Sequence, residues 1–273
     1  MGDNAIACRS RLVRLLTVTG LAAATLVAVA ACSSGGSGSE TPRKALLDTA
    51  SRTQHINSAI ETLTIRETGV QSVTTAGVIQ FRRSPTLLVG EELKLTAGDK
   101  STKLKAVLTG TAFYLNEPRL ASRLGKPWIK VDLSGQNETA LGSFSQLVHS
   151  LQSNNFLNLT HLFAATKNPR AVGQQTIDGV DTTEYAGTFH ASAALKALSP
   201  AYRKVLAPEF RALGNTPVHF HVWIDGQHYT RKATTVETIN GETISTTVTV
   251  TAINQPVQIT IPPTSQTITP PGA

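Results

Sequence analysis

The stretch that decides the fold runs from Val218 to Ile253 and reads "VHFHVWIDGQHYTRKATTVETINGETISTTVTVTAI". Apolar and polar residues alternate along it with a period of two, which is the pattern of strands with one buried and one solvated face. Two turn dipeptides, Asp225-Gly226 and Asn240-Gly241, divide it into three segments. Because Asp-Gly and Asn-Gly are preferred hairpin turns, the stretch predicts three long antiparallel strands.

The same signals continue toward the N-terminus. The segment 173–189, "GQQTIDGVDTTEYAGTF", carries the turn dipeptide Asp178-Gly179 between two extended halves and predicts another hairpin. Further upstream, alternation recurs in short segments, at 61–67, 76–83, 90–96, 101–110, 112–116 and 126–133. One-sided strands in succession indicate an antiparallel meander with one apolar face. After residue 253, "PVQITIPP" predicts a short extended piece that proline stops.

Helical spacing appears in three places. Thr41 followed by Pro42 has the form of an N-cap with proline at the first helical position, and the helix that follows has one buried face at Ala45, Leu46, Thr49, Ala50 and Thr53. Residues 139–165 predict two helices or one interrupted helix. Residues 191–213 are helical in pattern, but Pro200 and Pro208 divide them into short pieces.

The order of elements defines the expected fold class. Strand runs separated by helical segments predict an α+β fold, in which helices gather against one face of a curved antiparallel sheet. We expect residues 41–264 to form a single domain, because no linker interrupts them, and residues 265–273 to form a disordered tail.

The N-terminal segment has the layout of an export signal. Three arginines lie between Arg9 and Arg14, and an uncharged run follows that ends in Val29, Ala30, Ala31 and Cys32. These four residues resemble a bacterial lipobox, so residues 1–31 are expected to be cleaved and Cys32 to be lipidated. Residues 32–40, "CSSGGSGSE", would form a flexible tether. The alternative, a retained membrane-spanning helix, is disfavoured because the run is shorter than the roughly 20 apolar residues that a span needs.

The net charge and the cysteine count of the chain limit the kinds of binding partner and of stabilisation that are expected. The chain has a formal charge of +7 and two cysteines, of which Cys8 lies in the expected signal peptide. The exported domain would therefore depend on an apolar core instead of disulfides. A basic protein outside the membrane is expected to meet phospholipid headgroups, acidic glycolipids or wall polymers, and not nucleic acid.

We find no catalytic arrangement in the sequence. It contains no nucleophile elbow, no phosphate-binding loop and no zinc motif, so we expect neither an enzyme nor a cofactor or metal. His219, His221 and His228 could approach one another, but a solvated strand face explains the first two better than a metal site. A cluster of basic residues around the loop before Trp128 indicates either a headgroup-binding loop or a solvated one: Arg119, Arg123, Lys126 and Lys130.

Several of these features together resemble one lipoprotein family. They are the lipobox with its Ser/Gly tether, the helix around "KALLDTASRTQHINSA", the segment "VGQQTIDGVDTTEYAGTF" followed by "HASAAL", and "TPVHFHVWIDGQHYTRKATTV" leading to "VQITIPP". In type and order the chain resembles the LppX/LprAFG family of actinobacterial lipoproteins, within the LolA-like group of lipid carriers. The segment 119–170 matches that pattern less well than the rest.

The resemblance implies both an architecture and a function. The architecture is a half-open antiparallel barrel with helices over its concave face and an apolar cavity for acyl chains. The implied function is binding of lipids or glycolipids for transport or presentation across the cell envelope, by a monomer anchored through Cys32 on the outer face of the cell membrane. An envelope transporter is an implied partner.

Apolar residues on the expected inner faces are the candidates to line such a cavity. Each of them is equally compatible with an ordinary core, so the prediction applies to the set: Ile79, Phe81, Leu93, Leu95, Leu104, Leu108, Phe113, Leu115, Ile129, Val131, Phe144, Leu147, Phe220 and Val222. Two other functions stay open at this point. One is a surface-tethered interaction or sensor lipoprotein without a lipid ligand, and the other is an envelope hydrolase with an unrecognised site.

Overall fold

A computed structural model describes residues 40–68, 73–83, 87–133, 156–198, 213–239 and 241–269, together with Pro200, Arg203, Ala207 and Phe210. The expected signal peptide, Cys32 and most of the expected tether lie outside the described residues. So does the segment 134–155, which contains the candidates Phe144 and Leu147.

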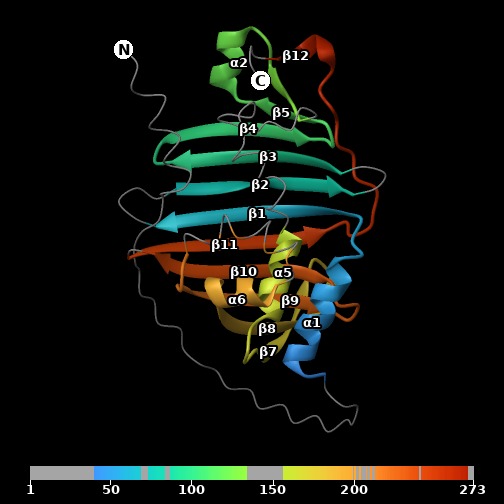
Figure 1. Ribbon diagram of the computed structural model, residues 1–273, viewed down its shortest axis with the longest axis vertical. Coiled ribbons are helices and arrows are strands. Elements are labelled where there is room, and N and C mark those ends of the chain that lie inside the picture. The colour runs from blue at the N-terminus through green and yellow to red at the C-terminus, as the bar shows by residue number, and fades with distance from the viewer. Residues whose placement is uncertain are drawn as a thin grey trace.

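The described strands form one twelve-stranded sheet in the order β12-β6-β5-β4-β3-β2-β1-β11-β10-β9-β8-β7 (Figure 1). Neighbouring strands are antiparallel except for β12 and β6, which are parallel. The strand bounds in chain order are β1 (Ser58–Thr68), β2 (Val73–Arg82), β3 (Leu88–Ala97), β4 (Lys100–Leu108), β5 (Ala112–Asn116), β6 (Trp128–Asp132), β7 (Arg170–Ile177), β8 (Val180–His190), β9 (Pro217–Asp225), β10 (Thr230–Ile239), β11 (Glu242–Thr251) and β12 (Thr267–Ile268).

The predicted strands are confirmed, with ends that differ by a few residues. The stretch that decides the fold forms β9, β10 and β11, and the segment before it forms the β7–β8 hairpin. Asp178 and Gly179 connect that hairpin with φ values of 48° and 80°. Positive φ at both central residues is typical of a type I′ turn, whose twist matches that of the flanking strands.

Four α-helices occur among the described residues: α1 (Pro42–Thr53), α2 (Pro118–Leu124), α5 (Phe156–Ala164) and α6 (Ala191–Ala197). The Thr41 side chain accepts a hydrogen bond from the Lys44 backbone N–H and caps α1, as predicted. The buried face of α1 consists of the residues that its spacing predicted. The helix α2 departs from the sequence-based prediction of a basic loop in this region.

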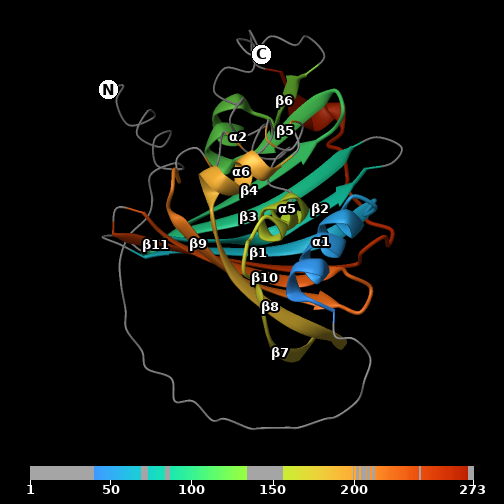
Figure 2. The same cartoon turned by 60° about the horizontal axis from the view of Figure 1, so that its bottom comes forward.

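The helices α1, α5 and α6 lie on the same side of the curved sheet (Figure 2). Phe163 of α5 stacks on Phe220 of β9, with ring centroids 4.6 Å apart, so this side of the sheet holds the core. The predicted α+β class, with helices over the concave face, is confirmed. None of the helices in the described parts of the chain is long and apolar enough to span a membrane.

The C-terminal segment departs from the prediction. Residues 265–269 are not a loose tail, because Thr267 and Ile268 pair with Trp128 and Ile129 of β6. Lys126 Nζ also donates a hydrogen bond to the Ser265 carbonyl at 2.5 Å. Two ladder residues between prolines give too short a pattern to reveal a strand in the sequence. Residues 270–273 lie outside the described part.

Candidate functional site

The concave face of the sheet is the candidate site, and its residues follow from strand parity. In a strand, successive side chains point to opposite faces, so every second residue faces the helices. On β9, Val218, Phe220 and Val222 are 0–2% exposed and face α5, whereas His219 lies on the outer face. The cross-strand register then extends each inner position into a row that crosses the sheet.

One row of the concave face is entirely apolar and buried. The register places its residues directly opposite one another from β1 to β6: Ala59, Phe81, Val89, Leu108, Phe113 and Val131. Their exposed fractions do not exceed 6%. Four cavity candidates belong to this row, and the structure places them together: Phe81, Leu108, Phe113 and Val131.

The next row combines apolar residues with two carboxylates. It runs from Glu61 through Ile79 and Glu91 to Ala106, Leu115 and Ile129. Glu61 is 1% exposed. Burial raises the pKa of Glu91 to about 7, since a charged carboxylate is poorly solvated there. The candidates Ile79, Leu115 and Ile129 therefore line an inner surface that is not purely apolar.

A third row contains the leucines that are least covered. Leu63, Gly77, Leu93 and Leu104 lie opposite one another on β1 to β4, and the three leucines are only half-buried. Gly77 is required here, because a Cβ at its position would lie 2.1 Å from the backbone carbonyl oxygen of Glu92 and 2.5 Å from Leu93 Cδ2. Leu95, two residues after Leu93 and on the same face of β3, is also half-buried. We call Leu63, Leu93, Leu95 and Leu104 the open leucines.

The far end of the concave face is acidic. Glu67 of β1 and Glu237 of β10 flank Ile244 of β11 in one row. Burial raises the pKa of each carboxyl to about 7, and the charge of Glu242 adds to the effect at Glu67. One carboxyl oxygen of each is buried without a hydrogen-bond partner among the described residues. The concave face thus runs from an apolar end to an acidic end.

The sequence analysis did not identify these inward-facing glutamates as site residues, although their positions in the alternating pattern could have indicated them. Glu91 has the parity of Leu93 and Leu95, and Glu61 has that of Leu63 and Ile65. A glutamate at an inward position is the informative exception in an alternating strand, because buried carboxyls are rare without a role.

The candidates Phe220 and Val222 belong to a different part of the concave face. Phe220 lies in a group of rings with Phe163 and Phe189, and Phe210 lies 6.5 Å from Phe189. A Cβ at Gly187 would meet the Phe220 ring at 2.8 Å, so the ring lies directly over the β8 backbone. These residues are core beneath α5 and α6, and the structure separates them from the open leucines.

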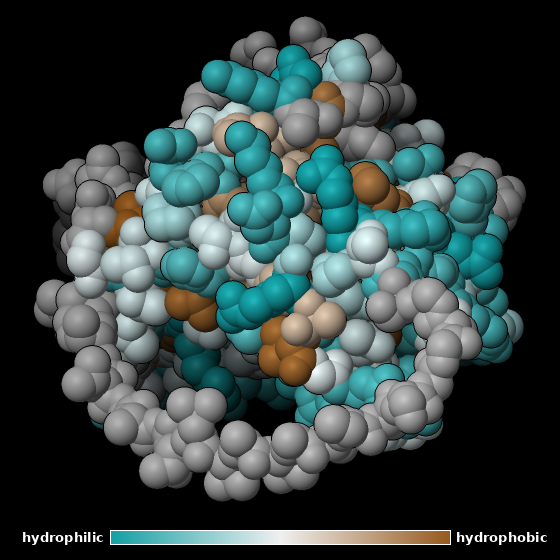
Figure 3. All heavy atoms as spheres, turned by 90° about the horizontal axis from the view of Figure 1, so that it is seen from below, coloured by the Kyte–Doolittle hydropathy of each residue, from teal (hydrophilic) through white to brown (hydrophobic). Residues whose placement is uncertain are grey.

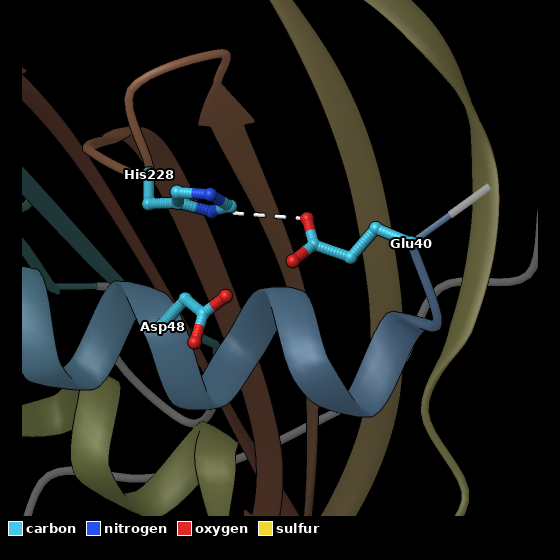
Figure 4. Close-up of side chains that lie close together, drawn as sticks. All are labelled: Glu40, Asp48 and His228. Carbon is cyan, nitrogen blue, oxygen red and sulfur yellow. Dashed lines mark ion pairs between the residues drawn. The ribbon is translucent and has the colours of Figure 1, made fainter. Parts of the chain in front are cut away.

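His219, His221 and His228 do not form a cluster. His221 Nδ1 lies 2.5 Å from Glu184 Oε1, and His219 Nδ1 lies 2.9 Å from Thr188 Oγ1, both on the outer face of the sheet. His228 lies in the turn between β9 and β10, near Glu40 and Asp48, and ligand atoms of these three residues lie within 4.8 Å of one another (Figure 4). Lys44 Nζ contacts both carboxylates, so an ammonium group already supplies the cation there.

Comparison with known proteins shows which family and which solved structures this chain resembles. Residues 154–260 match the LppX_LprAFG lipoprotein family. The crystal structure of LprF from Mycobacterium bovis is 15% identical, with a TM-score of 0.50, and the alignment covers 81% of this chain and 96% of that chain. The lipoprotein LppX from Mycobacterium tuberculosis is 19% identical, with a TM-score of 0.46 and coverages of 80% and 97%. None of the curated proteins matches the sequence.

The protein has the open, curved antiparallel sheet of LprF, with helices on the concave face. Over residues 154–260 the chain is similar to the LppX_LprAFG lipoprotein family, and it shares the LprF fold, as the sequence resemblance led us to expect. The matched family is described as a lipoprotein family.

Proposed function

We propose that the protein is an envelope lipoprotein, anchored through Cys32 on the outer face of the cell membrane, whose concave face binds the acyl chains of a lipid or glycolipid for transport or presentation. The open leucines carry this proposal. They are apolar, they share one region of the concave face, and they stay half-buried although fully buried rows lie beside them. Apolar surface of this kind gains about 0.8 kcal/mol for each methylene that an acyl chain buries against it.

The polarity of the concave face favours an amphiphilic ligand. Acyl chains would lie against the apolar rows, and the polar part of the lipid would lie toward Glu67 and Glu237. Their buried oxygens without partners would then accept hydrogen bonds from hydroxyl or amine groups. A glycolipid provides such donors, whereas a wax or an alkane does not.

Native mass spectrometry tests the proposal. The chain from Ser33 to Ala273, produced in an actinobacterial host, is measured before and after organic extraction. We expect an extractable mass that fragments as an acyl lipid. A bare polypeptide mass, together with no uptake of a fluorescent lipid, would contradict lipid binding.

A pair of adjacent substitutions locates the ligand. Leu104→Gln places an amide among the open leucines and is expected to reduce lipid uptake, while Lys103→Gln on the outer face of the same strand leaves it unchanged. Equal uptake by both variants would exclude this region as the binding surface.

One observation favours a second function. Along the edge strand β7 every residue from Arg170 to Thr176 is exposed. An edge with free backbone groups is a template for strand addition by another protein. If no lipid is found, a surface-tethered interaction or sensor lipoprotein becomes the better interpretation.

A further inference from the structure

A surface pocket lies between the C-terminal half of α1 and the turn that joins β9 to β10. Its volume is about 370 Å³, and it is lined by Asp48, Ser51, Arg52, His55, Gln227 and His228. All of these side chains are polar or charged. The pocket is separate from the concave face, where the acyl chains are proposed to bind.

Several donors in the pocket are unused. The side chains of Ser51, Arg52, His55 and Gln227 make no hydrogen bond or ion pair within the described part of the chain. The guanidinium of Arg52 lies over the ring of Tyr229, 4.8 Å from its centroid. Stacking of this kind fixes the plane of the guanidinium and leaves its N–H edges available.

The turn that completes the pocket is held by hydrogen bonds to a buried carboxylate. Asp225 Oδ1 accepts hydrogen bonds from the backbone N–H groups of Gln227 and Tyr229, both at 2.9 Å. Asp225 Oδ2 accepts from Arg231 Nε at 2.7 Å, and the Asp225 side chain is 4% exposed. His228 has a φ of 63°, the left-handed region that costs energy for a residue other than glycine. This turn therefore holds Gln227 and His228 in place before any ligand arrives.

The acidic groups near the pocket are already paired. Lys44 Nζ contacts Asp48 and also Glu40, the latter at 3.1 Å. His228 Nδ1 lies 3.8 Å from the other oxygen of Glu40 (Figure 4). Among the described residues that line the pocket, the Arg52 guanidinium is the charged group without an ion-pair partner, and it lies next to two imidazoles and two neutral donors.

We propose that this pocket binds a phosphate group. A guanidinium fork, imidazole N–H groups, a hydroxyl and an amide are the donors that phosphate oxygens accept, and arginine is the side chain best matched to them. The group would belong to a lipid headgroup of the bilayer that anchors the protein, or to a soluble phosphate. Only the bilayer source depends on the proposed lipidation of Cys32.

Chain geometry favours the bilayer headgroup. Glu40 contacts His228 and follows Cys32 by eight positions in the sequence, a distance of at most about 29 Å when the chain is fully extended. An anchored protein therefore keeps this pocket near the headgroups. The end of the molecule that carries β7 and the start of α1 is largely polar, with apolar residues in separate spots (Figure 3). Such a surface suits contact with headgroups better than insertion into hydrocarbon.

Histidine labelling tests the proposal on the full lipidated chain. Diethyl pyrocarbonate modification of His55 and His228 is quantified by peptide mass spectrometry, with the exposed His190 as internal reference. One arm adds inorganic phosphate to protein in nonionic detergent. The other compares proteoliposomes of phosphatidylcholine with and without phosphatidylglycerol. Arg52→Gln is the test variant, and Arg123→Gln on α2 is the matched control.

We expect phosphate and phosphatidylglycerol to protect His55 and His228 but not His190. Arg52→Gln should weaken phosphate affinity by about tenfold, since hydrogen bonds to charged groups contribute most to such binding, and Arg123→Gln should leave it unchanged. Protection by phosphate alone supports the phosphate site and excludes the bilayer source. No protection in either arm, or equal protection in Arg52→Gln, overturns the proposal. These outcomes do not depend on whether native mass spectrometry finds a lipid on the concave face. The phosphate pocket and the proposed lipid-binding function can therefore fail separately.

Discussion

Inward-facing glutamates make stability depend on pH. The carboxyl of Glu91 has its pKa raised from 4.5 to about 7 by burial, so the folded protein holds a proton that the unfolded chain releases above pH 4.5. Stability therefore falls as pH rises from about 4.5 to 7. Glu91→Gln removes this cost and should raise the free energy of unfolding at pH 8 by roughly 1–3 kcal/mol, with little change at pH 4.5.

Urea unfolding at the two pH values measures this effect. The matched control is Glu92→Gln, because Glu92 lies on the outer face and pairs with Lys105 at 2.5 Å. A gain in stability that is equal at both pH values would show that Glu91 acts through packing and not through its charge.

Asp225 offers a second test at the scale of a residue. Its buried carboxylate accepts two backbone hydrogen bonds and one from Arg231. Asp225→Ala leaves Arg231 without its counter-ion and should destabilise the fold by about 3–5 kcal/mol, the usual cost of removing one partner of a buried pair. Chemical denaturation measures the change. Asp181→Ala, at an exposed carboxylate, should cost far less, and equal losses would contradict the assigned role of the turn.

At the scale of elements, the contact between α5 and the sheet depends on a glycine. A Cβ at Gly187 of β8 would lie 2.8 Å from the Phe220 ring and 2.9 Å from Thr166 Cγ2. Gly187→Ala should therefore cost about 1–3 kcal/mol through overpacking. Gly173→Ala on β7 is the control, because no atom lies within 4 Å of the added carbon. Thermal unfolding compares the two variants, and equal melting temperatures would contradict close packing of α5 and β8.

The elements also show how far the sequence predicts the fold. The strands from β1 to β11 were predictable, because alternation and turn dipeptides are local signals. The helix α1 was predictable down to its buried face, since Thr41 and Pro42 mark its start. The short helix α2 and the strand β12 were not predictable, because seven and two residues are too short to establish a period. The strand β12 depends on pairing with β6, which is distant in the sequence.

The candidate site was predictable only in part, for a similar reason. Parity identified the inward leucines and phenylalanines but gave no measure of how completely the helices cover them. Phe220 and Leu104 have the same pattern in the sequence, yet Phe220 is buried under α5 and Leu104 stays half-buried. Coverage is a property of tertiary packing, so the separation between core and open leucines required the structure.

At the scale of the whole molecule, the two ends of the sheet differ. The end at β7 is exposed and mainly polar, with Gln174, Gln175 and Thr176 along it beside the exposed Val172. The end at β6 carries Ile129 and Val131, and there the chain places its own strand β12 against Trp128 and Ile129. An open apolar edge strand favours pairing between molecules. The C-terminal segment therefore covers the edge on which self-association would be most favourable.

This arrangement gives a prediction for a truncated protein. Deletion of residues 264–273 removes β12 and exposes the β6 edge, so we expect concentration-dependent dimers or larger species by light scattering after size-exclusion chromatography. Deletion of residues 270–273 leaves β12 in place and should not change the elution profile. The polar edge at β7 is the same in both proteins, so any difference between them reports on β6. If both truncated proteins are monomers, β12 contributes only to local order at the end of the sheet. Lys126 and the α2 region would then be sufficient to keep the β6 edge from pairing with other molecules.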